Sequence, residues 1–350
     1  MKIIYALSLL VMCFATPAAH AAELPGIAEF IDEMVAKHNF KRAELEKVFT
    51  QAQYIPAVIT IISRPATTRP WLIYRASFVN PQRIKFGLAF WHKNRNALRR
   101  AEQEYGVPEE IILAVIGVET IYGQDVGTFR TLDALTTLAF DYPSRAAFFH
   151  SELENLLLLA REQQLDLLAI RGSFAGAMGM PQFMPSSYRH YAVDFNGNHR
   201  IDLLGEAEDA IASVANYLKG YGWISKISGA IKPADASQPL SQEGVQVMAP
   251  ITVRAQISEE ICAGEITTPR TLAAWLAEGI VPNASLPPDQ TARLLDFTVG
   301  EEKEFWLAFN NFEVIRRYNN SDFYAMTVFQ LAAALKEENR QEDHRISGSP

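Results

Sequence analysis

The segment that decides the fold reads Pro108-Glu-Glu-Ile-Ile-Leu-Ala-Val-Ile-Gly-Val-Glu-Thr-Ile-Tyr-Gly123. Apolar residues would occupy most of the circumference of a helix with this sequence, so we predict a helix that is buried on nearly every side. Pro108 marks its first turn, where Glu109 and Glu110 complement the positive end of the helix dipole. A helix without a solvent face needs other elements packed around it, and we therefore expect it to lie inside a helical core.

The sequence on both sides of this segment is typical of a mainly helical protein. From Ala22 to about Tyr221, apolar residues recur at helical spacing and strand signals are almost absent. The clearest helical stretches are Gly26 to His38, Arg42 to Gln51, Pro81 to Tyr105 and Ser144 to Glu162.

The pattern changes after Trp223, where apolar runs become shorter and prolines more frequent. Val245 to Val253, which Pro250 interrupts, and Leu295 to Val299 are plausible strands. A helical pattern returns from Phe323 to Lys336. The mixed segment is therefore predicted to be an insertion into a helical body.

These patterns predict five parts along the 350 residues. The C-terminal part, residues 337–350, is polar and charged with little to bury, which favours disorder. The parts are a signal peptide over 1–21, a helical core over 22–224, an inserted small mixed or β domain over 225–312, a return to the core over 313–336 and a disordered tail over 337–350.

The first 21 residues have the features of an export signal: Lys2, an apolar run, and the small-x-small sequence Ala19-His20-Ala21 as a cleavage site. The run is too short to span a membrane as a mature helix. A lipoprotein would use Cys13, but Met12 stands where that modification normally demands a small residue. We expect a soluble periplasmic protein rather than a lipoprotein.

Composition excludes several classes of function. The formal net charge of −8 argues against a nucleic-acid partner. No Cys and His cluster has zinc spacing, and no phosphate-binding glycine loop is present. Loss of the signal would leave Cys262 as the one cysteine, so an intramolecular disulfide is excluded. Cys262 is interpreted as a buried small hydrophobe, with a nucleophile as the less favoured alternative.

Glu119 interrupts the apolar pattern of the segment 108–123. It shares a helix face with Ile112, Val115 and Ile116, and with Tyr122 ahead. A carboxyl in such surroundings loses hydration, which raises its pKa toward the range of a general acid at neutral pH. The alternative is a structural Glu paired with an arginine or a backbone group. Glycoside hydrolases usually need two carboxylates, and the nearby sequence offers no obvious second one, so a reaction served by a single carboxylate fits better.

Residues 172–188 form a second candidate site, because they mix glycine, polar and aromatic residues. Ser173 and Gln182 offer hydrogen bonds between aromatic residues, a combination that suits the hydroxyl edges and C–H faces of saccharides. A tight connection between helices is the alternative. The cluster 316–324 could bring further aromatic and amide groups to the same site, or could equally contain a helix cap at Asn320 or Ser321.

A possible calcium loop begins at Asp194. Side-chain oxygens stand at the first, third, fifth and ninth positions of an EF-hand-like spacing, and the carbonyl of Arg200 is available. His199 replaces the usual glycine, and the twelfth position is glycine instead of glutamate. A metal-free Asx turn is therefore a competing interpretation. Glu206, Glu208 or Asp209 could complete the site.

The motifs together resemble the lytic murein transglycosylase B family. The resemblance rests on Val118-Glu119-Thr120 with Tyr122-Gly123, on Gly172 to Gly179 followed by Pro181 to Tyr188, and on Asp209-Ala-Ile with Ser213 to Tyr217. It covers about Phe30 to Leu335. It implies a lysozyme-like α+β fold and cleavage of the β-1,4 bond between N-acetylmuramic acid and N-acetylglucosamine in peptidoglycan strands, with a 1,6-anhydro product and no cofactor for the chemistry.

The resemblance also implies roles for individual residues. Glu119 would act first as the acid and then as the base. Arg145 matches one of a pair of basic residues, but its neighbour is Ser144, which leaves one substrate contact in doubt. Ser173 and Gln182 match substrate-binding residues near the acid and the muramyl N-acetyl group. Positions that match saccharide contacts are Tyr217, Tyr318, Asn319 and Tyr324. A structural Ca²⁺ or Na⁺ would bind at Asp194, Asn196, Asn198, the carbonyl of Arg200 and Asp209.

Two rival functions stay open. A muramidase on the same fold would transfer the sugar to water, and a non-catalytic scaffold would bind peptidoglycan without turnover. A buried, unused Glu119 would be an avoidable desolvation cost, which argues against the scaffold. Calcium sensing is the least favoured, because one irregular loop is a poor switch. Cell-wall synthesis enzymes are candidate further partners.

Overall fold

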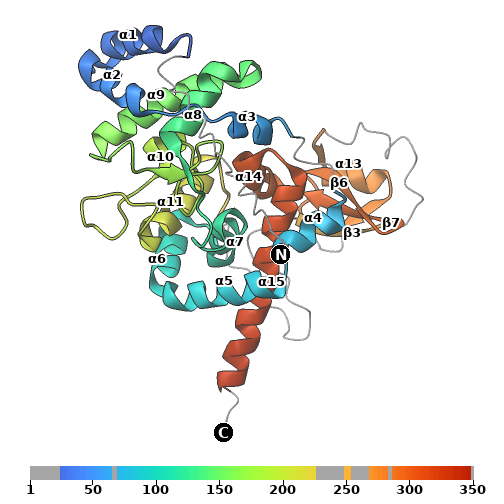
Figure 1. The fold of residues 1–350 in the computed structure, drawn as a ribbon. Helices are drawn as coiled ribbons and strands as arrows, with labels where there is room; N and C mark the ends of the chain where they lie inside the picture. The colour runs from blue at the N-terminus through green and yellow to red at the C-terminus, as the bar shows by residue number, and fades with distance from the viewer. Residues whose placement is uncertain (1–23, 65–68, 226–247, 254–267, 283–285, 348–350) are drawn as a thin grey trace, which may run out of the picture.

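The computed structural model describes residues 24–64, 69–225, 248–253, 268–282 and 286–347 (Figure 1). Its helices are α1 (Ile27–His38), α2 (Arg42–Gln51), α3 (Pro56–Ile62), α4 (Trp71–Phe78), α5 (Pro81–Lys93), α6 (Arg95–Tyr105), α7 (Glu109–Thr120), α8 (Thr131–Asp141), α9 (Ala146–Glu162), α10 (Pro185–Tyr191), α11 (Ala207–Gly220), α13 (Leu272–Ala277), α14 (Asn310–Asn319) and α15 (Asp322–Ser347). Its strands are β1 (Phe129–Arg130), β2 (Arg171–Gly172), β3 (Met248–Val253), β4 (Arg270–Thr271), β5 (Ile280–Pro282), β6 (Thr291–Val299) and β7 (Glu302–Ala308).

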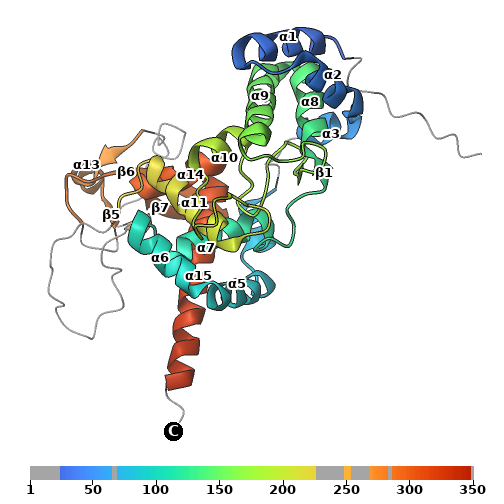
Figure 2. The same cartoon turned by 90° about the vertical axis from the view of Figure 1, so that its left-hand side faces the viewer.

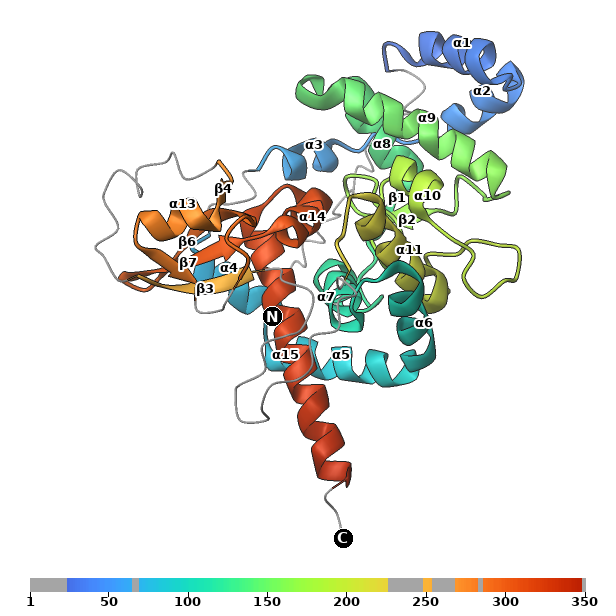
Figure 3. The ribbon, with the colours of Figure 1, turned by 180° about the vertical axis from the view of Figure 1, so that it is seen from behind.

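Helix α7 lies inside the helical body, as predicted. Every residue from Ile111 to Val118 is buried. Helices α5, α6, α11 and α15 pack against it, and Figures 1 and 3 show α7 between α11 and the long helix α15. The last turn of α7 is thus surrounded by segments that are far apart in the sequence.

Helices α8, α9 and α10 form the neighbouring part of the body, and α9 packs against both of the others. Figure 2 shows α1 and α2 at the far ends of α8 and α9. Phe30 of α1 and Phe49 of α2 are buried in contact with each other, with ring centroids 5.9 Å apart. The predicted helices 26–38 and 42–51 are therefore confirmed to within a residue.

A five-stranded antiparallel sheet follows in the chain, with strand order β4-β6-β7-β3-β5. Alternate residues of β6 face opposite sides, as the two-residue period of a strand requires. Leu294 belongs to a small cluster with Trp275 of α13. Leu295 and Phe297 belong to the main core, where Phe297 lies 4.8 Å from the ring of Trp71. One face of the sheet is therefore attached to the helical body.

The strand that contains Pro250 is present, although proline has no N–H to donate to a sheet. In β3, Met248 to Pro250 pair with β7 and Ile251 to Val253 pair with β5. Pro250 thus lies where the strand changes partner. This arrangement explains how an interrupted apolar run still forms a strand.

The predicted helical stretch Pro81 to Tyr105 is two helices, α5 and α6. Asn94 separates them with non-helical φ and ψ of −112° and 20°. Its side-chain Nδ2 donates to the carbonyl oxygen of Phe90 at 2.9 Å. An Asn side chain that bonds to nearby backbone competes with continuation of the helix, and the helical periodicity did not reveal the break.

The prediction of a disordered tail from residue 337 is wrong up to Ser347, because α15 continues to that residue. Charged side chains stabilise the extension: Arg340 pairs with Glu337 at 2.8 Å within the helix, and Glu342 accepts from His92 of α5 at 2.9 Å. The prediction counted apolar burial and overlooked these pairs. The preceding helix α14 begins at Asn310, three residues before the predicted return to the core.

The predicted signal peptide over 1–21 and Cys262 lie outside the described residues. Within the parts of the chain that are described, no helix combines the length and the apolar character needed to cross a membrane.

Candidate functional site

Glu119 lies in the last turn of α7, where its side chain is partly exposed beside buried neighbours. Its Oε1 accepts a hydrogen bond of 2.6 Å from the hydroxyl of Tyr324. Although part of the residue is exposed, the surrounding buried groups desolvate its carboxyl and raise the pKa of Glu119 to about 7; the Tyr324 hydrogen bond opposes this rise. The alternative of a Glu paired with an arginine or a backbone group is not what forms: within the described residues, this carboxyl accepts its hydrogen bond from the side chain of Tyr324.

Four tyrosines from four different helices lie close enough to Glu119 to sense its charge. They are Tyr74 on α4, Tyr217 on α11, Tyr318 on α14 and Tyr324 on α15. Burial and the negative charge of Glu119 raise the pKa of each of them. Each tyrosine therefore stays neutral and can donate a hydrogen bond at physiological pH.

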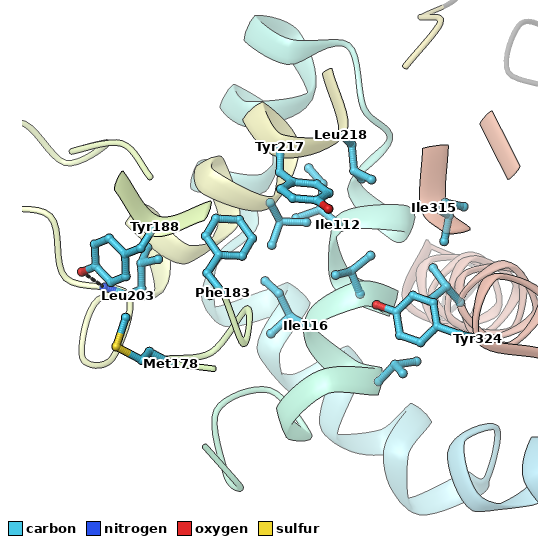
Figure 4. Packing of buried hydrophobic residues seen from close by; sticks show 14 of the residues in the cluster. Ile112, Ile116, Met178, Phe183, Tyr188, Leu203, Tyr217, Leu218, Ile315 and Tyr324 are labelled. Atoms are coloured by element: carbon cyan, nitrogen blue, oxygen red, sulfur yellow. Dashed lines mark hydrogen bonds between the residues drawn. The ribbon is translucent and has the colours of Figure 1, made fainter. Parts of the chain in front are cut away.

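The aromatic rings near Glu119 form a continuous row that begins at Tyr324 and continues through Tyr318 and Tyr217 to Phe183. The rings of Tyr324 and Tyr318 are nearly parallel, with centroids 6.2 Å apart, and Tyr318 lies 4.8 Å from Tyr217. Phe183 lies 5.4 Å from Tyr217. Figure 4 shows Phe183 beside Tyr217, and the hydroxyl of Tyr324 directed toward α7. The tertiary structure thus joins the aromatic residues of 172–188 to those of 316–324.

Backbone carbonyls fix two of these tyrosines. The hydroxyl of Tyr318 donates to the carbonyl oxygen of Pro181 at 2.7 Å, and that of Tyr217 donates to the carbonyl oxygen of Arg317 at 3.1 Å. The first bond attaches α14 to the segment after Gly179, and the second attaches α11 to α14. Preorganised rings of this kind suit a binding site, because little side-chain freedom is lost when a ligand binds.

The segment 172–188 is attached to the end of α7 by Thr120. The hydroxyl of Thr120 donates to the carbonyl oxygen of Met180 at 2.8 Å and accepts from the N–H of Gly123 at 3.0 Å. Gly179 has φ +72°, and a Cβ there would lie 2.5 Å from the carbonyl oxygen of Leu203. Glycine is therefore required at this close approach.

Ser173 and Gln182 both support the fold of this segment. The Ser173 hydroxyl oxygen accepts from the N–H of Ala177 at 3.1 Å, so it stabilises a local turn. The side-chain amide of Gln182 donates to the carbonyl oxygens of Val126 and Gly179 at 3.0 and 3.1 Å. The alternative of a tight connection is therefore correct in part, since the polar groups that could contact a sugar also hold the segment together.

Two predicted substrate-binding residues, Arg145 and Asn319, are exposed, and within the described residues no side-chain hydrogen bond or ion pair joins either of them to Glu119. Arg145 lies immediately before α9, with its guanidinium 4.3 Å from the ring centre of Phe148. Asn319 is exposed at the end of α14. The helix-cap interpretation of the neighbouring sequence is confirmed at Ser321, whose hydroxyl oxygen accepts from the N–H of Tyr324 at 3.3 Å.

The segment 194–206 folds as a compact loop before α11. Asp194 accepts from the N–H groups of Gly197, Asn198 and His199 at 2.7–3.1 Å. The side-chain amides of Asn196 and Asn198 both donate to the carboxylate of Glu206. These backbone contacts form an Asx turn.

Asp209 is fully buried beneath this loop. Its two carboxylate oxygens accept from the N–H groups of Phe195 and Asp202 at 2.8 and 2.9 Å. It therefore joins the two ends of the loop. Within the described part of the chain, no three His, Cys, Asp or Glu side chains group closely enough to form a metal site by themselves, so a cation here would depend on amide and carbonyl oxygens.

A cavity of about 540 Å³ lies at the opposite end of α7 and contains none of the predicted site residues. Its walls include Glu110 and Lys336, which form an ion pair of 2.7 Å. Paired charges line this cavity, whereas aromatic rings lie near Glu119.

Tyr74 was missed by sequence reasoning. It lies on α4, well before the motifs that carry the resemblance, and its surroundings contain only an aromatic pattern, Trp71, Tyr74 and Phe78, that is equally typical of a core helix. Only the packing of α4 against α15 and β6 brings it near Glu119.

Comparison with known proteins decides the family. Residues 23–333 match the sequence model of the family described as the transglycosylase SLT domain. The chain belongs to this family. It is a lytic transglycosylase, a lyase that acts on peptidoglycan, and the predicted lysozyme-like fold is confirmed.

Relatives of this lytic transglycosylase align with most of its length. The membrane-bound lytic murein transglycosylase B of Escherichia coli K12 is 41% identical over 324 residues, 90% of this chain and 83% of the relative. The crystal structure of soluble lytic transglycosylase SltB1 from Pseudomonas aeruginosa is 40% identical, with a TM-score of 0.78, over 93% of this chain and 100% of that one. Lytic transglycosylase Slt35 of E. coli in complex with calcium is 40% identical, with a TM-score of 0.79, over 92% and 96%.

Proposed function

We propose that Glu119 is the single catalytic acid and base of this lytic transglycosylase. The observation that carries the proposal is its carboxyl group, which accepts one hydrogen bond from Tyr324 and has a pKa of about 7. Such a group can donate and accept a proton at neutral pH. No second carboxylate within the described residues contributes to the pKa of Glu119, which favours chemistry that needs one.

In the proposed reaction, protonated Glu119 gives its proton to the glycosidic oxygen as the bond to C1 of N-acetylmuramic acid breaks. The resulting carboxylate then takes the proton from the C6 hydroxyl of the same sugar, whose oxygen bonds to C1. The products are a 1,6-anhydro end and a free hydroxyl on N-acetylglucosamine. Water is not consumed, and Glu119 ends protonated as it began.

We propose that the tyrosine rings form the wall that binds the glycan strand, with Tyr217, Tyr318 and Tyr324 as saccharide contacts. Tyr74 is proposed as a further saccharide contact. Ser173, Gln182, Arg145 and Asn319 remain proposed contacts to the substrate. The crystal structure of SltB3 from P. aeruginosa in complex with NAG-NAM-pentapeptide, 30% identical to this chain, supports a glycan fragment with a peptide as the ligand class.

Mass spectrometry of muropeptides tests the reaction. Purified sacculi digested with the mature protein are expected to release fragments that end in 1,6-anhydromuramic acid, because the C6 hydroxyl takes the place of water. Reducing muramic acid ends would identify a muramidase instead. An absence of released fragments would favour the non-catalytic scaffold.

Replacement of Tyr324 by Phe is expected to shift the fall in kcat/KM on the alkaline side of its pH profile to higher pH. The hydrogen bond from Tyr324 lowers the pKa of Glu119, so its loss lets the pKa rise further, and the acid form that starts the reaction persists to higher pH. The pH dependence of glycan cleavage measures this. Tyr318→Phe is the matched comparison, since its hydroxyl donates to Pro181; an equal shift in both variants would contradict the assignment.

We propose that the loop 194–206, together with Asp209 in the first turn of α11, binds Ca²⁺ or Na⁺. The ligands would be Asp194, Asn196, Asn198, the carbonyl of Arg200 and Asp209, with Glu206 as a further ligand. The calcium complex of Slt35 supports this. The loop supplies oxygen donors, which hard cations prefer. Rotation of the Asn196 and Asn198 side-chain amides would turn their oxygens, instead of their N–H groups, toward a cation bound beside the Glu206 carboxylate. The cation would have a structural role and take no part in the reaction.

His199 is expected to weaken cation binding. It has φ +67° where an EF-hand loop has glycine, and a left-handed residue other than glycine costs about 1 kcal/mol. His199→Gly should therefore strengthen the stabilisation by CaCl₂, measured by thermal unfolding. Asp194→Asn should abolish the calcium-dependent increase in the unfolding temperature. An equal increase in unfolding temperature with CaCl₂ in the wild type and in Asp194→Asn would contradict the proposal.

We also propose export to the periplasm by residues 1–21, because the peptidoglycan substrate lies outside the cytoplasmic membrane. Cleavage after Ala21 and release from cells by osmotic shock would support it, whereas an uncleaved chain that stays with the cytoplasm would contradict it. Acylation at Cys13 is the outcome that would instead indicate a lipoprotein.

A further inference from the structure

The carbonyl end of α7 is held by a side chain from another helix. Arg83 of α5 is buried, and its Nη1 donates to the carbonyl oxygen of Gly117 and contacts that of Val118 at 3.4 Å. These residues immediately precede Glu119. The last carbonyls of a helix have no partners within it, and a cation complements the negative end of the helix dipole. Arg83 therefore caps the turn that carries Glu119.

The chain leaves this turn through two left-handed residues, neither of which is glycine. Ile121 has φ 51° and Tyr122 has φ 59°. The N–H of Ile121 donates to the carbonyl oxygen of Gly117 at 3.2 Å, the same oxygen that Arg83 contacts. Such residues are strained and persist only where the surrounding contacts hold them.

The ring of Tyr122 fills a slot between α5 and α7. A Cβ on Gly87 would lie 2.4 Å from the Tyr122 hydroxyl oxygen, and one on Gly117 would lie 2.6 Å from it. Only glycine fits at either place. Gly87 follows Arg83 by four residues and lies on the same face of α5. One face of α5 thus supplies both the cap and the slot for the turn after Glu119.

We propose that Arg83 is a positioning residue for the reaction: it holds the last turn of α7 so that the carboxyl of Glu119 meets both Tyr324 and the glycosidic oxygen. Arg83 is buried among α5, α7 and the ring of Phe78, which lies 5.2 Å from its Cζ, and it acts on the substrate only through Glu119. The inference rests on the proposed role of Glu119.

Arg83→Met keeps the length and apolar volume of the side chain but removes its hydrogen bonds. We expect kcat to fall by about 10-fold or more, because small displacements of a catalytic group are costly, while KM for soluble glycan fragments stays within about twofold. Hydrogen exchange at the amides of Ile121 and Tyr122 should accelerate. Arg83→Lys retains a cation and N–H donors and should recover part of the lost kcat. Arg99→Met, at an exposed arginine on α6, is the matched control.

Unchanged kcat and unchanged exchange in Arg83→Met would overturn the proposal, as would a fall in kcat that only follows the folded fraction in urea. If Arg83→Met does not fold, Arg83→Lys decides: faster exchange at Ile121 with lowered kcat supports the proposal, and wild-type values of both contradict it. Exchange is measured without substrate, so its result is independent of the role of Glu119, which Glu119→Gln tests separately.

Discussion

Glu119→Gln is expected to lower kcat by about 1,000-fold, because in the proposed reaction the same carboxyl serves as acid and then as base, and general acid–base catalysis is typically worth 100-fold to 10,000-fold. Gln keeps the size of the side chain and can still accept from Tyr324, so substrate binding should persist. Release of anhydro-ended muropeptides from sacculi measures the rate. Activity of Glu119→Gln within a few fold of the wild type would refute the catalytic assignment.

The same variant has a second signature in stability. The pKa of Glu119 is raised from 4.5 to about 7 in the folded protein, so the folded state holds this proton more tightly than the unfolded state does. The stability that Glu119 contributes is present below pH 4.5 and is lost as pH rises through about 7. Gln has no proton to lose, and urea unfolding of the variant should lack this decline.

Glu110→Gln is the matched control, since Glu110 lies on the same helix and pairs with Lys336 at 2.7 Å. It should keep wild-type kcat and the decline in stability from Glu119. Equal losses of kcat in both variants would point to disruption of α7 as a helix.

Arg293→Met is expected to lower the free energy of unfolding by about 2 kcal/mol, because it removes a buried guanidinium that donates charge-assisted hydrogen bonds to two carboxylates. Arg316 still pairs with both of them, at 3.4 Å from Glu313 and 3.1 Å from Asp322, so neither carboxylate is left without a cation. Arg293 of β6 is buried and donates to Asp322 through two bonds of 2.6 and 3.0 Å and to Glu313 at 2.9 Å. It joins the sheet to α14 and to the start of α15. Urea denaturation measures the change.

Arg270→Met provides the control for charge alone. Arg270 lies in the same sheet and pairs with Glu278 at 2.6 Å, but both side chains are exposed, and such pairs contribute about 1 kcal/mol at most. A loss in Arg293→Met no larger than in Arg270→Met would mean that the attachment of the sheet does not depend on Arg293.

The helical core could be predicted because its signal is local. Apolar spacing marked α1 and α2 to within a residue, and the apolar circumference of 108–123 marked the burial of α7. The break at Asn94 and the helical tail were not predicted. At Asn94 a side chain bonds to nearby backbone, and in the tail charged side chains pair with one another and with α5; hydrophobic periodicity detects neither kind of interaction.

The mainly helical fold, the family and the candidate residue Glu119 could all be predicted along the chain, because a lone carboxyl on an apolar helix and long ordered motifs are local features of the sequence. Tertiary structure alone decided the surroundings of Glu119. Tyr74 and Tyr324 are separated from it by 45 and 205 residues, respectively, and Arg83 reaches its helix from α5. Such contacts depend on how helices pack side by side, and no single segment encodes the partners that another segment supplies.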